Sequence, residues 1–218
     1  MNLLCLESST EACSVALSTP DGIIERSAIE PRAHARLMLP WARELLAEAG
    51  LGWSAMDALA VDIGPGGFTS LRIGLGITQG IALAHDLPVH PVSSLRILAE
   101  SADPERARPW LMALLDARMG EVYAACYHAS GDGRELIGGE WLTRPDELSA
   151  PTGGPWWLAG PGVSAHRDAL VDRLGNRIAG QDADAWPQAS TLARLAPEVA
   201  SVPGHQLIPT YLRDQVTG

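Results

Sequence analysis

The sequence predicts a mixed α/β protein built of two successive units, and three observations support that class. Short apolar runs joined by polar turns open the chain, and strand-like runs that alternate with helical patterns follow them. The same succession begins again at Trp110. The stretch 102–106 between the two series is polar and contains proline, as domain boundaries often do. We therefore expect one unit over 1–104 and a smaller one over 105–218, and we leave open whether the last helix returns to the first unit.

The first unit is expected to open with an antiparallel meander, because polar turns separate its first three apolar runs and Asp21-Gly22 favours a tight hairpin. Gly50 is placed to end the helix that follows. The expected elements are strands over 3–6, 12–17 and 23–29, a helix over 33–49, a strand over 58–63, a helix over 69–84, a strand over 88–92 and a helix that starts at 93 or 94 and ends at 100.

The helix over 69–84 is the most distinctive element. Gly and Pro residues break the strand before it. Thr69 or Ser70 can cap the helix, because a side-chain oxygen there can accept a hydrogen bond from a free N–H group of the first turn. Only Arg72 is charged between Phe68 and Ala84, so the composition predicts a helix that is buried nearly all round. Small residues line two neighbouring faces at four-residue spacing: Gly76, Gly80 and Ala84 on one face, and Gly74, Thr78 and Ala82 on the other.

These interior glycines need an explanation, because each costs a helix about 1 kcal/mol relative to alanine. Close approach of another backbone is the usual compensation. That backbone belongs either to the protein's own sheet or to a helix of another chain, and the spacing leaves both open. A bulky residue at Gly76 or Gly80 would unfold the protein in the first case and prevent association in the second.

The second unit repeats the pattern of strands with tight turns followed by alternating helices and strands. No sequence identity between the halves is visible, so the repeat concerns architecture only. The expected elements are strands over 110–115, 121–128 and 134–142, a short helix over 145–150, a strand over 156–160, and helices over 164–174 and 191–199.

Composition limits the function classes. The net charge of -10 argues against a protein that binds nucleic acid by itself, which would carry a basic face. Cys5, Cys13 and Cys126 have no metal-type spacing and are typical of reduced core residues. The N-terminus lacks the charged start of a signal peptide, and no apolar run is long enough to cross a bilayer. We expect a cytoplasmic protein without membrane association.

Two turns are candidate anion sites. The tip formed by Glu7, Ser8 and Ser9 lies between two expected buried strands and can aim N–H groups and hydroxyls at an anion. Gly66 and Gly67 precede a helix start, where the helix dipole favours negative charge. An ordinary polar hairpin is the simpler explanation of the first turn. Neither turn matches a Walker or a Rossmann fingerprint.

The sequence gives little support to a metal site or to nucleophilic catalysis. No two of the six histidines stand four residues apart, so no helix offers a two-histidine zinc face, and we predict no metal site. A Gly-x-Ser-x-Gly elbow is absent, and we assign no catalytic residue. Asp116, Arg118 and Glu121 gather at one turn. They could form a polar site, but a solvated turn held by a salt bridge is favoured.

Several stretches together resemble one family, the TsaB family, also called YeaZ. The resemblance runs from end to end, and its specific parts are the glycine-rich block and the block over 116–123; the first hairpin is shared by a wider superfamily. The matching stretches are Glu7-Ser-Ser-Thr-Glu-Ala-Cys-Ser-Val-Ala-Leu17, Gly64-Pro-Gly-Gly-Phe-Thr-Ser-Leu-Arg-Ile-Gly74, Ile77-Thr-Gln-Gly-Ile-Ala-Leu83, Asp116-Ala-Arg-Met-Gly-Glu-Val-Tyr123 and Pro209-Thr-Tyr-Leu-Arg213. The resemblance implies an actin/Hsp70/sugar-kinase-like (ASKHA) fold of two lobes, with mixed sheets flanked by helices.

The resemblance also implies a function. Family members are non-catalytic subunits of the bacterial complex that forms N6-threonylcarbamoyladenosine next to the anticodon of tRNAs that read codons starting with A. The implied partners are a catalytic paralogue, TsaD, which the subunit binds and activates, and a small ATPase, TsaE. Transfer RNA is held only through the complex, and the isolated subunit forms homodimers. Such a chain is no enzyme by itself, although the transferase complex requires it. The alternative is a stand-alone ATP-dependent phosphotransferase of the same fold.

The resemblance assigns residues as well. The family's interaction surface is built from two helices that correspond to 33–49 and 69–84. The interface candidates are His34, Leu37, Met38, Trp41, Leu45, Leu71, Leu75, Gly76, Gln79, Gly80 and Leu83. The candidates for a weak nucleotide site are Glu7, Ser8, Ser9, Gly66 and Gly67. Superfamily members that bind nucleotide usually place Asp where this chain has the longer Glu7, so we expect weak or no nucleotide binding and no intrinsic cofactor. ATP or ADP would then be bound at the interface of the complex.

Overall fold

The computed structural model describes residues 1–131 and 133–213, and its contacts divide the chain into two units. Unit 1 comprises 1–97 and 187–210, and the described part of unit 2 comprises 98–131, 133–186 and 211–213. The first division therefore falls inside helix α3 (Ser94–Ala102), earlier than the polar stretch 102–106. The chain returns to unit 1 with α6 (Ala189–Leu195).

Unit 1 contains a six-stranded sheet in the order β11-β5-β4-β1-β2-β3. The first three strands form the expected antiparallel meander, and β4 and β5 run parallel to β1. The strands are β1 (Leu3–Glu7), β2 (Ala12–Thr19), β3 (Gly22–Ile29), β4 (Ala58–Asp62), β5 (Pro88–Val92) and β11 (Val202–Pro203). Because β1 and β4 are parallel neighbours, their C-terminal residues Glu7 and Asp62 end at the same edge of the sheet.

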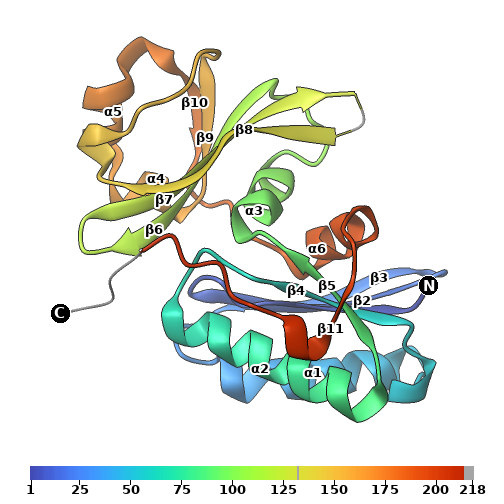
Figure 1. Cartoon of the computed structure of the whole chain (residues 1–218). Coiled ribbons are helices and arrows are strands. Elements are labelled where there is room, and N and C mark those ends of the chain that lie inside the picture. Colours follow the sequence, from blue (N-terminus) through green and yellow to red (C-terminus); the bar gives the residue numbers. More distant parts are fainter. Residues whose placement is uncertain (132, 214–218) are drawn as a thin grey trace. The chain divides into compact units, whose positions relative to one another are not determined.

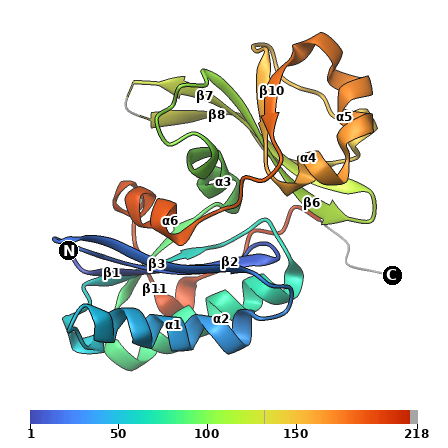
Figure 2. The same cartoon turned by 180° about the vertical axis from the view of Figure 1, so that it is seen from behind.

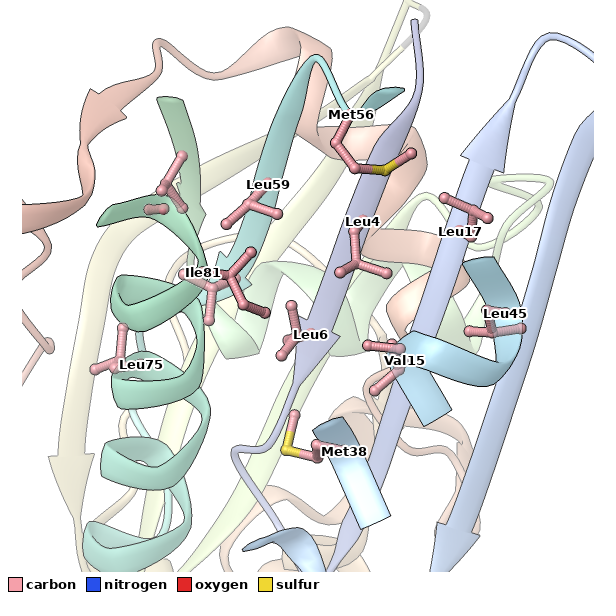
Figure 3. Packing of buried hydrophobic residues seen from close by; sticks show 14 of the residues in the cluster. Leu4, Leu6, Val15, Leu17, Met38, Leu45, Met56, Leu59, Leu75 and Ile81 are labelled. Carbon is pink, nitrogen blue, oxygen red and sulfur yellow. The ribbon is translucent and has the colours of Figure 1, made fainter. Parts of the chain in front are cut away.

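Helices cover both faces of this sheet. α1 (His34–Glu48) and α2 (Phe68–His85) lie on one face and α6 lies on the other (Figure 1 and Figure 2). Leu4 and Leu6 pack in the core with α1 and α2 (Figure 3), whereas Leu3 and Cys5 pack with α6. Alternating residues of β1 thus belong to two cores, which explains the continuous apolar run over 3–6. The short 3-10 helices of the unit are η1 (Trp53–Ala55), η4 (Ala196–Glu198) and η5 (Gly204–Gln206).

Unit 2 contains a five-stranded sheet in the order β10-β9-β6-β7-β8. In chain order, β6, β7 and β8 form an antiparallel meander, β9 runs parallel to β6, and β10 runs parallel to β9. The strands are β6 (Trp110–Arg118), β7 (Glu121–Ser130), β8 (Gly133–Thr143), β9 (Trp156–Ala159) and β10 (Ile178–Asp182). The helices are α4 (Pro161–Ala165), α5 (Arg167–Leu174), η2 (Pro145–Glu147) and η3 (Gly175–Arg177).

Unit 2 differs from the sequence expectation at three elements. The sequence does not predict β10, because Gly180 and Asp182 interrupt any apolar run and the strand is only partly buried. The helix expected over 164–174 is two helices that meet at His166, whose φ of -133° lies outside the helical region. The helix expected over 145–150 is the single 3-10 turn η2.

The two units share one topology. The order β5-β4-β1-β2-β3 in unit 1 matches the order β10-β9-β6-β7-β8 in unit 2. Each unit is a three-stranded meander followed by two parallel strands. The predicted class, two mixed sheets flanked by helices, is confirmed.

Candidate functional site

The turn that follows β1 closes on its own side chains. Glu7, Ser8 and Ser9 are 0%, 0% and 1% exposed. Oε1 of Glu7 accepts a hydrogen bond from the backbone N–H of Ser9 at 2.9 Å and another from the Ser9 hydroxyl at 2.5 Å. The Glu7 carboxyl therefore already binds an N–H group that an anion at this turn would need.

A second carboxyl meets the same turn from the neighbouring strand. Oδ1 of Asp62 accepts hydrogen bonds from the Ser8 N–H at 2.8 Å and from the Ser8 hydroxyl at 3.2 Å. Its other oxygen, Oδ2, lies 3.5 Å from the hydroxyl of Ser94, and the residue is fully buried. The parallel pairing of β1 with β4 explains why side chains 54 residues apart meet here.

The glycine loop after β4 packs directly on this turn. The N–H of Gly67 donates to the carbonyl oxygen of Ser9 at 2.7 Å. A Cβ on Gly66 would lie 2.3 Å from that oxygen, so only glycine fits. The two candidate anion sites thus bond to each other, and the N–H groups of Ser8, Ser9 and Gly67 are all used within the chain. This arrangement favours a locked turn over a phosphate site, and weak nucleotide binding stays a prediction.

Burial dominates the electrostatics of the two carboxyls. It raises the pKa of Asp62 to about 7, although hydrogen bonds from Ser8 and Ser94 oppose the shift. Burial also raises the pKa of Glu7 well above its usual range, and the charge of Asp62 raises it further. Oε2 of Glu7 has no hydrogen-bond partner among the described residues. Among the residues that the structure describes, neither the Glu7 nor the Asp62 carboxyl forms an ion pair.

The two small-residue faces of α2 have different surroundings. The face that begins with Gly74 is buried, and a Cβ on Gly74 would lie 2.2 Å from Oγ of Ser8. The other face is open, because a Cβ on Gly76 or Gly80 would meet nothing within 4 Å. Leu83 is 88% exposed. The expectation of all-round burial is therefore wrong: α2 is squeezed against its own unit on one side and bare on the other.

The first turn of α2 also differs from expectation. Gly67 is the residue before the helix, and neither Thr69 nor Ser70 caps it. The Ser70 hydroxyl instead donates to the carbonyl oxygen of Gly67 at 3.1 Å. The guanidinium of Arg72 lies 3.3 Å from the centroid of the exposed Phe68 ring.

The interface candidates fall into two groups. Five have buried side chains: His34, Met38, Leu45, Leu71 and Leu75. Of these, Met38, Leu45 and Leu75, which Figure 3 labels, pack in the core with Leu4 and Leu6. These five are buried within unit 1, and their place in an interface stays a prediction. The remaining six, which we call the outer helix surface, are exposed or half-buried: Leu37, Trp41, Gly76, Gln79, Gly80 and Leu83. His34 has an internal role, since its Nε2 lies 3.0 Å from the carbonyl oxygen of Thr10.

The corresponding turn of unit 2, between β6 and β7, is held by ion pairs. Asp116 lies 3.2 Å from a nitrogen of Arg118 and 3.2 Å from Nε2 of His166. Glu121 lies 2.5 Å from Arg213. The structure thus shows a solvated turn with salt bridges, the interpretation that the sequence favours. Sequence reasoning missed His166 and Arg213, because they lie 50 and 92 residues from their partners and no local pattern connects them.

A cavity of about 430 Å³ lies beside the unit 2 turn. Its wall contains Met119, Gly120, Arg144, Pro145, Asp146, His166 and Ala169. The Arg144 guanidinium already pairs with the Asp146 carboxylate at 2.9 Å, and the His166 ring already contacts Asp116. The two charged side chains of this wall, Arg144 and Asp146, therefore neutralise each other.

Metal and thiol chemistry have no visible site. Within residues 1–131 and 133–213, no group of three or more His, Cys, Asp or Glu side chains could hold a metal ion. The three cysteines are free and buried. Burial raises the pKa of the Cys13 thiol to about 11 and that of Cys126 to about 12, so both stay protonated. None of the described helices is both long and apolar enough to cross a membrane.

The topology and a family model together define the class of protein. The model for TsaD, described as tRNA N6-adenosine threonylcarbamoyltransferase, matches residues 13–172, which is most of the chain. The chain is therefore a member of the TsaD-type class of two-lobed ASKHA-like proteins.

Comparison with individual proteins defines the family within this class. The tRNA threonylcarbamoyladenosine biosynthesis protein TsaB of Escherichia coli K12 is 34% identical over 99% of this chain and 96% of its own length. The Bacillus subtilis protein of the same name is 28% identical over 98% of this chain and 94% of its own. The solved structure of YeaZ from Pseudomonas aeruginosa has a TM-score of 0.87 and 38% identity, and it covers 97% of this chain and 99% of that one. The chain belongs to the TsaB (YeaZ) family.

Proposed function

We propose that this chain is the non-catalytic, activating subunit for a TsaD-type transferase in the bacterial synthesis of N6-threonylcarbamoyladenosine on tRNA. The named relatives are tRNA threonylcarbamoyladenosine biosynthesis proteins, and the similarity extends over nearly the full length of both chains. That extent supports carrying the whole role over rather than one part of it.

The open face of α2 is the observation that carries the partner role. Gly76 and Gly80 lie one turn apart, and each costs the helix about 1 kcal/mol relative to alanine. Their own unit gives nothing in return, since no atom lies within 4 Å of a Cβ placed on either. A second backbone that packs there would explain both glycines. Leu83 and Trp41 on the same outer helix surface supply apolar anchors of the kind that interfaces use.

A paralogue of the same fold is the occupant that fits this surface. It would present an equivalent pair of helices, so the two chains could pack about an approximate two-fold axis. A second copy of this chain could use the same surface in the absence of the paralogue, and homodimer and heterodimer would then compete. The net charge of -10 favours tRNA contacts through the paralogue. A TsaE-like ATPase is the third component.

We place nucleotide chemistry in the complex and not in the isolated chain. The N–H groups that could cradle a phosphate are bonded to Glu7, Asp62 and a carbonyl oxygen of the same turn. ATP or ADP would therefore bind at the interface of the complex. The same bonds give the alternative, a stand-alone phosphotransferase, no supporting observation.

Reconstitution tests the proposal. The modified nucleoside is measured on tRNA with the partner proteins and threonylcarbamoyl-adenylate, with and without this chain. We expect modification to depend on the chain and the chain to be inert alone. Equal modification without it would overturn the proposed role.

One variant locates the surface. Gly80→Leu should weaken association with the paralogue by at least about tenfold and reduce modification, while the thermal unfolding midpoint does not fall. Gly52→Leu is the matched control, because Gly52 is also exposed, a Cβ there also meets nothing within 4 Å, and it lies outside the outer helix surface. Unfolding of Gly80→Leu would assign this face to the core instead.

A further inference from the structure

Glu7 and Asp62 form a buried pair of acids that the proposed role leaves unexplained. Each carboxyl receives two hydrogen bonds on one oxygen, from Ser9 on Oε1 and from Ser8 on Oδ1. In the part of the chain that the structure describes, the second oxygen of each carboxyl lacks a good hydrogen-bond donor. Oε2 of Glu7 has no partner among the described residues, and Oδ2 of Asp62 has only the Ser94 hydroxyl at 3.5 Å. Two ionised carboxylates in this setting would be strongly unfavourable.

The surroundings of the pair make this charge problem worse. β4 contributes Asp62 itself, and β3 contributes Glu25, whose negative charge also acts on Glu7. β2 contributes Cys13, a buried thiol that the charge of Glu7 affects in turn. On α1, the ring of His34 contacts the carbonyl oxygen of Thr10, and no described cation pairs with either acid. Both acids are fully buried, and a proton is the smallest group that can neutralise such a pair.

The same cluster is connected to α2 at two points. Ser8 bonds to Asp62 with its N–H and hydroxyl, and its side chain fills the space above Gly74, in the middle of the helix. Ser9 bonds to Glu7 and accepts the N–H of Gly67, the residue before the helix. The turn of Glu7, Ser8 and Ser9 is therefore the link between the acid pair and the helix that carries the outer helix surface.

We propose that Glu7 and Asp62 together retain one proton at neutral pH. This proton keeps α2 packed against the turn of Glu7, Ser8 and Ser9, and thereby keeps the outer helix surface formed. Loss of the proton places two anions in the buried cluster, and their repulsion displaces the turn on which Gly67 and Gly74 rest. Association through the outer helix surface then weakens. The part of this proposal that concerns association rests on the proposed function, whereas the retained proton does not.

The direction of the pH dependence follows from the raised pKa values. The folded protein binds the proton more tightly than the unfolded chain, in which a carboxyl titrates near its ordinary pKa of about 4. The stabilisation is therefore complete below about pH 4 and is lost as the pH rises through the folded pKa, which for Asp62 is about 7 and for Glu7 is raised as well. The two steps belong to the pair as a whole.

Thermal unfolding of the isolated chain between about pH 5 and about pH 9 tests the retained proton. We expect the unfolding midpoint of the wild type to fall as the pH rises. Glu7→Gln and Asp62→Asn should each reduce that fall, and the double variant should remove it. The control is Glu44→Gln, which changes an exposed acid on α1 and should keep the wild-type slope. Parallel slopes for the wild type and all three variants would overturn the proposal.

Carbon-13 NMR of the glutamate carboxyl groups gives a readout that does not depend on stability. The signal that disappears in Glu7→Gln should have the shift of a neutral acid at about pH 6. A carboxylate shift there would overturn the retained proton. If added magnesium or sodium raises the midpoint of the wild type but not that of Glu7→Gln, a bound cation neutralises the pair and the proposal is wrong.

Association with the paralogue tests the second step. The wild type should bind about tenfold more weakly at about pH 9 than at about pH 6, and the double variant should lose less of its affinity. If neither protein binds the paralogue at any pH while the unfolding slopes differ, the proposed function fails and the retained proton stands. If the wild type and the double variant lose equal affinity, the retained proton does not control association, and this second step is wrong.

Discussion

The turn after β1 in unit 1 and the turn after β6 in unit 2 occupy equivalent positions in one topology, yet their acidic side chains have opposite surroundings. The Glu7 carboxyl is fully buried and accepts its hydrogen bonds from Ser9 of its own turn. Asp116 keeps 22% of its side chain exposed and is paired with Arg118 and His166. The first turn packs against the start and the middle of α2, whereas the second ends at an exposed Met119.

This difference shows how one topology can hold a strand end in two ways. In unit 2, arginine side chains neutralise the acids at the surface, where water and salt also reach them. In unit 1, hydrogen bonds and close backbone packing hold the turn, and charge is hardly screened there. We therefore expect small steric changes to be costly at the first turn and tolerated at the second.

The largest contrast should come from adding a single methyl group to each turn. Gly66→Ala places a Cβ 2.3 Å from the carbonyl oxygen of Ser9, so the glycine loop must move, at a cost of about 3 kcal/mol. Gly120→Ala meets no atom within 4 Å and carries only the strain of a φ of +77°, about 1 kcal/mol. Urea unfolding of both variants measures the difference. Equal losses would mean that the first turn is not locked as the structure indicates.

A smaller contrast is expected between two glycines of α2. Gly74→Ala drives a Cβ against Oγ of Ser8 and should lower the free energy of unfolding by about 2 kcal/mol. Gly76→Ala enters open space and should raise it by up to about 1 kcal/mol, because alanine is the better helix former. The two substitutions are chemically identical and lie on the same helix, so each is the control for the other. A stabilising Gly74→Ala would refute the contact between Ser8 and α2.

The contrast between these glycines also marks what the sequence can predict. Four-residue spacing identifies both small-residue faces of α2, and the meander with its tight turn follows from apolar runs and turn residues. Which of the two faces is buried depends on the orientation in which α2 packs on the sheet. Glycine adds no charge to either face, so composition alone indicated burial all round, and the exposed Leu83 shows the error.

The buried acid pair lay beyond sequence reasoning for a different reason. Glu7 is recognisable as a departure from the Asp expected in superfamily members that bind nucleotide, but the sequence indicates Asp62 only as the polar end of an apolar strand. Their meeting depends on the parallel pairing of β1 with β4, which joins residues more than fifty positions apart. The same holds in unit 2 for Arg213, whose partner Glu121 lies 92 residues earlier.

The smallest effect should come from the arginine that holds the second turn. Arg213→Ala removes the pair with Glu121 and a hydrogen bond to the carbonyl oxygen of Ala117, and should cost about 1 kcal/mol at low salt. Because this pair is partly exposed, added salt should shrink that cost, which urea unfolding at two salt concentrations measures. The pH slope that Glu7→Gln reduces should not respond to salt in this way, since the acid pair in unit 1 is buried. A loss at Arg213 that salt leaves unchanged would show that the second turn is held by packing, as the first is, and the difference between the two turns would disappear.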